Sequence, residues 1–420
     1  MYQKTVPPPL KAGSDYSKLY STKFIFTNFG ANNWRLVTGS YFLLALSSPY
    51  LYNKTSKKFG CDILAEILAT VMAVFAVIGA LDKIFGNRLK LGDEFEKGIM
   101  TLGPLSLSML GMMTIAPALA DLLLPVITPV ANLFGFDPSA LAGILIANDM
   151  GGAALADSVA TDSLLGSFHG LCVASMLGAT ISFTIPVALR SSKKENHNDV
   201  LLGLLCGIST IPVGCFVSGL VMGISPFTVL INLAPAILIS VIIIIGLLKF
   251  PEITIKIFSV FGKLISILIT CGLALGIFQT LTGKTILKNT APLMESAATV
   301  FTICITLAGT FPLIAIISKL LKKPLSALGK KLDLDDTSVV GLIATLANSI
   351  ATMESADRMN RKGRVMNLAF AVSAAFVFGD HLAFTLSYND EHIVPVIIGK
   401  LVAGFTALVV AVVLEKKTKK

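Results

Sequence analysis

The sequence predicts an all-α integral membrane protein, with about nine to eleven transmembrane segments in two inverted repeats that each contain a re-entrant or broken helix. Hydrophobic residues make up 54% of the chain and charged residues only 14%, whereas a soluble domain carries roughly a quarter charged residues. The mean hydropathy is +0.80. Lipid satisfies no backbone hydrogen bonds, so a chain with this composition has to build a helical bundle.

Apolar runs recur along nearly the whole chain, and each is close to the length of about 20 residues that crosses a hydrocarbon core of about 30 Å. Helices are therefore expected at these runs. They are Ile63–Leu81, Ile99–Ala120, Leu164–Leu189, Val200–Met222, Phe227–Leu248, Ile265–Leu281, Ala297–Ile317, Val365–Leu386 and Ile393–Leu414.

Basic residues orient these spans, because the cytoplasmic loops of membrane proteins are rich in Lys and Arg. The connection 82–97 and the segment 190–194 are both basic, so both are expected inside. Three apolar segments lie between these two loops, and three crossings of the membrane would place the loops on opposite faces. The middle segment, about 125–160, is therefore expected to dip into the membrane and return to the side it came from.

The second half of the chain contains a matching segment. The stretch VVGLIATLANSIAT, Val339–Thr352, has basic residues before it in 319–331 and after it in 358–364. It is therefore expected to be a second hairpin that enters from the opposite, cytoplasmic face. Within the two hairpins, LIAN at 145–148 matches TLAN at 345–348.

These features divide the chain into an N-terminal extension, a transmembrane domain and a short tail. The extension, 1–60, is expected to lie at the membrane surface, with an extra span or a misassigned start as the alternatives. The basic tail, 416–420, is expected in the cytoplasm. The domain between them, 61–415, comprises repeat one at about 61–223, a connector span at about 227–248 and repeat two at about 254–415.

Interrupted segments at corresponding positions of two repeats are the best sequence pointer to the binding site of a secondary transporter. The first one contains ANDMGG, in which Asn148 and Asp149 supply polar groups. Gly151 and Gly152 allow the chain to leave helical geometry. Asn348 is the counterpart in the second segment. A polar residue at a membrane interface is the alternative interpretation of this motif.

Ionisable residues inside apolar runs are a second indicator of function, because inserting one costs about 2.5 to 3.5 kcal/mol. Asp380 and His381 lie in FVFGDHLAF, toward the outer end of a predicted span, where they could coordinate a cation, carry a proton or bind a metal. Lys400 is expected to pair with a buried carboxylate, such as Asp380 or Asp149, in either a structural or a transport role. His169 and Asn232 are expected to be satisfied by helix packing.

Several long motifs occur in an order that resembles one family. The run from about Asp62 to Leu414 looks like the EutH family of ethanolamine-utilisation membrane proteins. The resemblance implies a multi-pass bacterial protein of the cell (inner) membrane that takes up ethanolamine. The sequence departs from the family pattern in the extra segment 1–60 and in the polar stretch TMESAD at 352–357. The motifs are GDEFEKGIMTLGPLSLSMLGM (92–112), DMGG (149–152), FTIPVAL (183–189), GLIATLANSI (341–350), RKGRVMNLAFAVSAAFVFGDH (361–381) and IIGKLVAG (397–404). By this resemblance, family-like motif positions are occupied by Asp149, Asn348, Asp380, His381 and Lys400.

The chemistry of ethanolamine suits these residues. At neutral pH it is a primary ammonium with a hydroxyl, so Asp149 or Asp380 would bind the cation, and Asn148, Asn348 or His381 would bind the hydroxyl. Helix C-terminal carbonyls would add negative potential. Coupling to protons or sodium, facilitated diffusion and a homo-oligomeric state all stay open.

Other function classes fit less well. A transporter of another small solute, such as a carboxylate, would be expected to carry Arg or Lys in the hairpins, which lack them. An intramembrane aspartyl protease would need GxGD, but the run 377–380 reads VFGD, and HExxH, GxSxG and P-loop motifs do not occur. The net charge of +9 lies in loops, so nucleic-acid binding is not expected. The six cysteines have no metal-site spacing, and no cofactor is indicated.

Overall fold

The computed structural model describes residues 49–145 and 152–418, and these residues form helices and no strand. The chain divides into two units, Met1–Lys57 and Lys58–Lys420, and the contacts discussed below lie within the second. In the first half the helices are α2 (Pro49–Ile84), α3 (Leu91–Met100), α4 (Leu102–Leu105), the π-helix η2 (Ser106–Leu110), α5 (Gly111–Phe134), α6 (Ser139–Leu145), α7 (Gly152–Val159), α8 (Ser163–Ser167), the π-helices η3 (Phe168–Gly178) and η4 (Thr180–Thr184), α9 (Ile185–Ser191), the 3₁₀ turn η5 (Lys194–Asn196) and α10 (His197–Val221).

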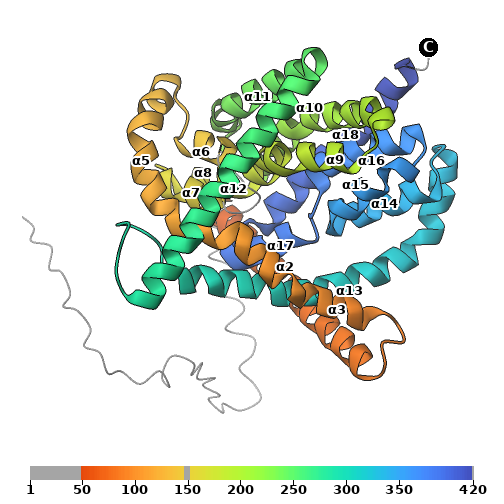
Figure 1. Cartoon of the computed structure of the whole chain (residues 1–420), viewed down its shortest axis with the longest axis horizontal. Coiled ribbons are helices and arrows are strands. Elements are labelled where there is room, and N and C mark those ends of the chain that lie inside the picture. The colour runs from red at the N-terminus through yellow and green to blue at the C-terminus, as the bar shows by residue number, and fades with distance from the viewer. Residues whose placement is uncertain (1–48, 146–151, 419–420) are drawn as a thin grey trace, which may run out of the picture. The chain divides into compact units, whose positions relative to one another are not determined.

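The second half is built from a similar series of helices, and Figure 1 shows both halves. The helices α10, α16 and α18 pack against one another. The bounds are α11 (Pro226–Lys249), α12 (Pro251–Thr282), α13 (Leu293–Lys331), α14 (Asp336–Ala347), α15 (Ser349–Ser355), the 3₁₀ turn η6 (Ala356–Arg358), α16 (Arg361–Ala374), α17 (Asp380–Tyr388), the 3₁₀ turn η7 (Asp390–His392) and α18 (Ile393–Thr418).

Eight helical stretches in the described part of the chain are long and apolar enough to cross a membrane. Large apolar side chains on their outer faces are exposed, including Leu281 at 80% and Phe227 at 73%. A soluble protein rarely exposes so many apolar side chains, whereas lipid accommodates them. The predicted all-α integral membrane class is confirmed. The stretches are Ala65–Ile84, Leu91–Phe134, Ser163–Ser191, Lys194–Val221, Pro226–Lys249, Pro251–Thr282, Leu293–Leu321 and Asp390–Glu415.

Among the spans predicted from the sequence, Val365–Leu386 is the exception, because it does not form one continuous helix. The helix α16 ends at Ala374, and α17 begins at Asp380. Between them the backbone turns, with Phe376 in the left-handed region at φ 59°. Hydropathy along the chain gave no sign of this break, since the residues on both sides of it are apolar.

Each predicted hairpin is closed at its base by an aspartate. Asp137 accepts hydrogen bonds from the backbone N–H of Thr161 at 3.0 Å and of Asp162 at 3.2 Å. In the second half, Asp335 accepts one from the backbone N–H of Asn360 at 2.5 Å. Asp162 and Asn360 in turn cap the helices that follow, α8 and α16. The same kind of contact therefore joins the two ends of both hairpins.

Glycines bring each hairpin against the next helix in the same way. A Cβ at Gly143 would lie 2.9 Å from the carbonyl oxygen of His169, and a Cβ at Gly341 would lie 2.5 Å from Oδ1 of Asn367. Equivalent residues of the two halves are 198 positions apart in the sequence. This difference holds for the two glycines, for His169 and Asn367, and for Asp137 and Asp335. A single register therefore relates the two halves.

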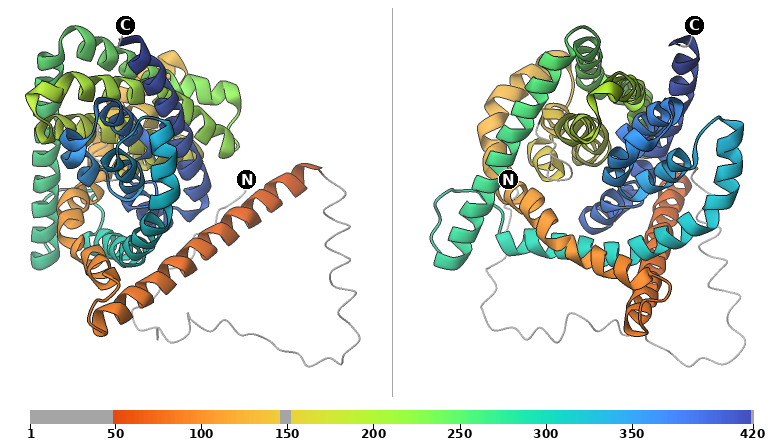
Figure 2. Two further views of the ribbon diagram at one scale, coloured as in Figure 1. Left: turned by 90° about the vertical axis from the view of Figure 1, so that its right-hand side faces the viewer. Right: turned by 45° about the vertical axis from the view of Figure 1, so that its right-hand side comes forward.

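Two glycines that hold helices of one half against helices of the other, Gly111 and Gly309, also differ by 198, whereas their partners Met72 and Ile269 differ by 197. A Cβ at Gly111 in α5 would lie 1.8 Å from the carbonyl oxygen of Ile269 in α12, and Figure 2 shows α5 and α12 side by side. Reciprocally, a Cβ at Gly309 in α13 would lie 1.9 Å from the carbonyl oxygen of Met72 in α2. A difference of 198 would pair position 348 with position 150, two positions away from the LIAN and TLAN match. The division into two repeats at the predicted bounds stays a prediction.

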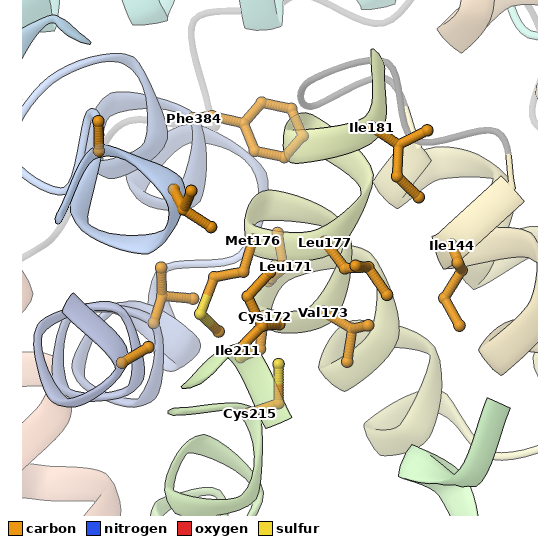
Figure 3. Close-up of a cluster of buried hydrophobic side chains, with 14 of the residues drawn as sticks. Ile144, Leu171, Cys172, Val173, Met176, Leu177, Ile181, Ile211, Cys215 and Phe384 are labelled. Atoms are coloured by element: carbon orange, nitrogen blue, oxygen red, sulfur yellow. The ribbon is translucent and has the colours of Figure 1, made fainter. Parts of the chain in front are cut away.

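The largest buried cluster surrounds the π-helical segment η3, as Figure 3 shows. Every residue from Phe168 to Gly178 is buried. Neighbouring helices reach this segment through small residues, and a Cβ at Gly170 would lie 2.8 Å from the Cα of Ala153 in α7. The η3 segment is therefore the centre against which the first hairpin and the second half both pack.

Candidate functional site

The break between α14 and α15 consists of one extended residue, Asn348, at φ −156° and ψ 116°. Its side chain accepts a hydrogen bond from the backbone N–H of Ile350 at 2.8 Å and so caps α15. Asparagine is among the best N-cap residues, which explains why the chain restarts a helix here. The break leaves the last carbonyls of α14 without partners inside their own helix.

A second break, at 375–379 between α16 and α17, supplies those partners. The backbone N–H of Phe376 donates to Thr345 O at 3.1 Å, and that of Phe378 donates to Leu346 O at 2.8 Å. A Cβ at Gly379 would lie only 2.1 Å from the carbonyl oxygen of Ala347. The two breaks therefore form one junction, which we call the break junction (345–348 and 375–381).

Ionisable and aromatic side chains gather at this junction. Asp380 is half-buried and stands in the first turn of α17, where the helix dipole favours a negative charge. His381 is buried, and its ring centroid lies 5.4 Å from that of Phe376. The ring of Phe183, from η4 of the first half, lies 6.1 Å from Phe376. A carboxylate, an imidazole and two aromatic rings therefore lie at or against the second of the two breaks that form this junction.

Both breaks lie at a similar distance from the base of the second hairpin. Asp335 and Asn360, just before α14 and α16, are hydrogen-bonded to each other. From there α14 runs for 12 residues and α16 for 14 residues before breaking. At a rise of 1.5 Å per residue these lengths are about 18 and about 21 Å. The two breaks therefore lie about 20 Å from the shared base at Asp335 and Asn360.

The structure thus brings three of the predicted site residues, Asn348, Asp380 and His381, to one place. Gly152 begins α7 and is buried. The other hairpin residues of the prediction, Asn148, Asp149 and Gly151, lie outside the described residues. Sequence reasoning missed Phe376, since nothing in an apolar run indicates a residue with positive φ.

Lys400 is fully buried in α18, and its Nζ donates to the carbonyl oxygen of Ser175 at 3.0 Å. Ser175 lies in the π-helical η3, and π-helical turns often occur at functional sites. Lys400 therefore joins the last helix of the second half to the core of the first. Its pairing with a carboxylate stays a prediction.

The two other polar residues singled out from the sequence are satisfied, as predicted. The Nδ1 atom of His169 lies 2.8 Å from Ser139 Oγ, and its Nε2 atom lies 3.2 Å from the carbonyl oxygen of Asn232. The side chain of Asn232 donates to Thr228 O and accepts from the backbone N–H of Asp137. Both residues help to hold the base of the first hairpin.

A polar pocket lies at the far end of α17. It has a volume of about 400 Å³, and its lining includes Asp157, Glu295 and Tyr388. The hydroxyl of Tyr388 donates to Asp157 Oδ2 at 2.7 Å, which ties α17 to the first hairpin. Since α17 runs from Asp380 to Tyr388, this one short helix links the pocket to the break junction.

Comparison with known proteins agrees with the resemblance seen in the sequence. The family described as "Ethanolamine utilisation protein, EutH" matches residues 64–414. The chain belongs to the EutH family. No solved structure matches this chain.

Named relatives of this EutH-family chain are similar over most of their length. The "Probable ethanolamine permease EutH" of Listeria monocytogenes is 46% identical over 355 residues, covering 84% of this chain and 95% of the relative. The protein of the same name in Escherichia coli is 37% identical over 390 residues, covering 84% and 96%. The "Uncharacterized protein YxeR" of Bacillus subtilis is 41% identical over 346 residues, covering 82% and 94%. These relatives and the apolar helices support a transport role for a multi-pass membrane protein.

Proposed function

We propose that this chain takes up ethanolamine across the cell membrane as its ammonium cation, and that the cation binds at the break junction. The observation that carries the proposal is the pair of backbone hydrogen bonds from Phe376 and Phe378 to the end of α14. They hold two broken helices against each other, the arrangement in which secondary transporters build substrate sites near the midplane.

Each group at the junction has a role suited to this substrate. The Asp380 carboxylate pairs with the ammonium, and the C-terminal end of α14 adds negative potential beside it. The faces of Phe376 and Phe183 favour a cation by cation–π attraction. Asn348 and His381 hydrogen-bond the hydroxyl. In the same proposal, Asn148, Asp149, Gly151 and Gly152 of the first hairpin complete the site from the other repeat.

Transport follows from movement of one repeat against the other around this junction. The bases of the hairpins are closed by Asp137 and Asp335, so the hairpins move as units. Asp157 and Glu295 give the pocket at the far end of α17 a negative lining that attracts a cation. In this arrangement the pocket faces outward, and the hairpin base at Asp335 and the C-terminus face the cytoplasm.

Uptake of labelled ethanolamine into proteoliposomes at acidic pH tests the proposal. The intact chain is compared with Asp380→Asn, Asp149→Asn and the surface control Asp93→Asn, whose side chain is exposed beside Lys83. We expect saturable uptake that is lost in the Asp380 variant and retained in the control. Absence of uptake by the folded intact protein would refute ethanolamine transport. Full uptake by Asp380→Asn would move the cation site away from the break junction.

A further inference from the structure

An apolar groove lies on the α11–α12 side of the molecule and is separate from the break junction. Its volume is about 580 Å³, and Thr254 is the only residue with a polar side chain among its described lining residues. Ile144 and Ile181, which Figure 3 labels, belong to the lining from the first hairpin and η4. The α11–α12 wall is formed mainly by Ile239, Ile243, Phe250, Ile253, Phe258 and Phe261.

The mouth of this groove is basic. A neighbouring hollow of about 570 Å³ shares Ile253, Ile257 and Phe261 with the groove, and Lys256 lines it. Lys263 lies two helical turns further along α12, on the same face as Lys256. Both lysines and Lys249, the last residue of α11, are exposed.

Two further side chains lie close to this mouth. Arg190 reaches it from α9, where its guanidinium donates to Ser259 Oγ at 3.2 Å. Glu252 lies in the first turn of α12. The three lysines and Arg190 outnumber it, so the mouth carries a net positive charge.

The groove also has the right position for a membrane component. The helix α12 has 32 residues, so it is about 48 Å long and exceeds the hydrocarbon core of about 30 Å. The first third of α12, which holds Lys256, would therefore reach the headgroup region of the cytoplasmic leaflet, where basic residues concentrate. Lys263 starts about 10 Å further inward, and its long side chain can extend back toward that region. With Lys256 at the level of the headgroups, the apolar wall of the groove extends from there toward the membrane interior, as far as Ile239.

We propose that the groove binds one anionic glycerophospholipid of the cytoplasmic leaflet, with an acyl chain along the isoleucine and phenylalanine wall and the phosphate at Lys256 and Lys263. Basic pockets between transmembrane helices on this side are typical sites for anionic headgroups. A second copy of the chain fits less well, because it would bring the same basic mouth against this one.

Lipid binding by the purified full chain tests this proposal. Native mass spectrometry is used to titrate phosphatidylglycerol and phosphatidylcholine with identical acyl chains. We expect the wild type to bind phosphatidylglycerol more tightly than phosphatidylcholine. The double variant Lys256→Gln/Lys263→Gln should bind phosphatidylglycerol about 25-fold more weakly, because each lysine contributes about fivefold to the affinity. The matched control Lys284→Gln/Lys288→Gln changes two lysines beyond the other end of α12 and should bind as the wild type does.

A second variant tests the apolar wall. Ile253→Trp narrows the groove and should weaken both lipids, whereas Ile245→Trp, on α11 but outside the groove lining, should weaken neither. Unchanged melting temperatures confirm that the variants fold. Equal affinity for the two lipids, or full phosphatidylglycerol binding by the double lysine variant, would overturn the proposal. So would a dimer in lipid nanodiscs that Ile253→Trp dissociates, because the groove would then be an interface between copies.

Discussion

Gly379 lies directly against the carbonyl oxygen of Ala347, so that a Cβ at Gly379 would be only 2.1 Å from that oxygen. This contact joins the α16–α17 break to the α14–α15 break. The residue after each partner is a proposed site residue, Asp380 in one case and Asn348 in the other. The absence of a side chain at Gly379 is therefore what allows the carboxylate and the amide to share one junction.

Gly379→Ala is expected to abolish or strongly reduce uptake. The added methyl group meets a backbone oxygen, which cannot rotate away, so the two breaks must separate, and overpacking of this kind typically costs about 1–3 kcal/mol. Proteoliposome uptake and thermal melting check this expectation. Gly103→Ala is the matched control, because no atom lies within 4 Å of the position of its Cβ. Wild-type uptake by Gly379→Ala would show that the breaks can separate without loss of function.

Substitution of Asn348 should separate capping from substrate binding. Asn348→Ala removes the acceptor for the N–H of Ile350 and should cost about 1 kcal/mol of stability. Asn348→Ser keeps a good capping group but removes the amide. We expect both variants to raise the KM for ethanolamine and only the alanine variant to lower the melting temperature. An unchanged KM in the serine variant would limit Asn348 to the capping role.

The base of the second hairpin should depend on pH through Asp335. Burial opposes ionisation of this carboxyl, but hydrogen bonds from the backbone N–H groups of Asn360 and Ser338 outweigh it and hold its pKa below the ordinary value of 3.8. A lowered pKa stabilises the fold fully above the unfolded value, and this contribution is lost as the pH falls through the folded value. The same reasoning applies to Asp137, whose pKa is lowered in spite of burial by hydrogen bonds from Ser139 and Thr161.

Melting temperatures measured from pH 7 to pH 3 check this dependence. The melting temperature of the wild type should be nearly constant down to about pH 5. It should fall below about pH 4, where these carboxylates protonate in the unfolded chain before they do so in the folded protein. Asp335→Asn should be less stable at pH 7 and should lose less on acidification. Asp333→Asn, with its exposed side chain in the same turn, is the control and should follow the wild type. Parallel curves for Asp335→Asn and the wild type would contradict the role of Asp335.

The hydrogen bond between Tyr388 and Asp157 is expected to help close the pocket at the far end of α17. Tyr388→Phe removes a donor worth about 1 kcal/mol, which would shift an open–closed equilibrium about fivefold toward the open state. A thiol placed at Ser158, an exposed residue of the pocket, reports this opening through its labelling rate. The background carries Cys271→Ser, because Cys271 is exposed. A labelling rate that Tyr388→Phe leaves unchanged would exclude this gating role.

The sequence by itself determined the class of this protein, most of its spans and the location of an interrupted segment around Asn348. These features follow from hydropathy, charge and capping, which act over a few residues or turns and so can be read along the chain. The long motifs determined the EutH family in the same way. Asp380 and His381 were identified as unusual because a charged or titratable side chain in an apolar run is costly wherever it lies.

Only the tertiary structure decided that Val365–Leu386 breaks and that this break packs against the one at Asn348. The break at Phe376 and Gly379 is stabilised by N–H groups that donate to Thr345 and Leu346, about 30 residues earlier in the chain. No local pattern records a hydrogen bond between segments so far apart, and the apolar residues around the break fit a continuous helix equally well. The contact of Lys400 with Ser175 and the single register of the two repeats were hidden for the same reason. They depend on which backbones approach each other, and packing of the whole bundle decides that.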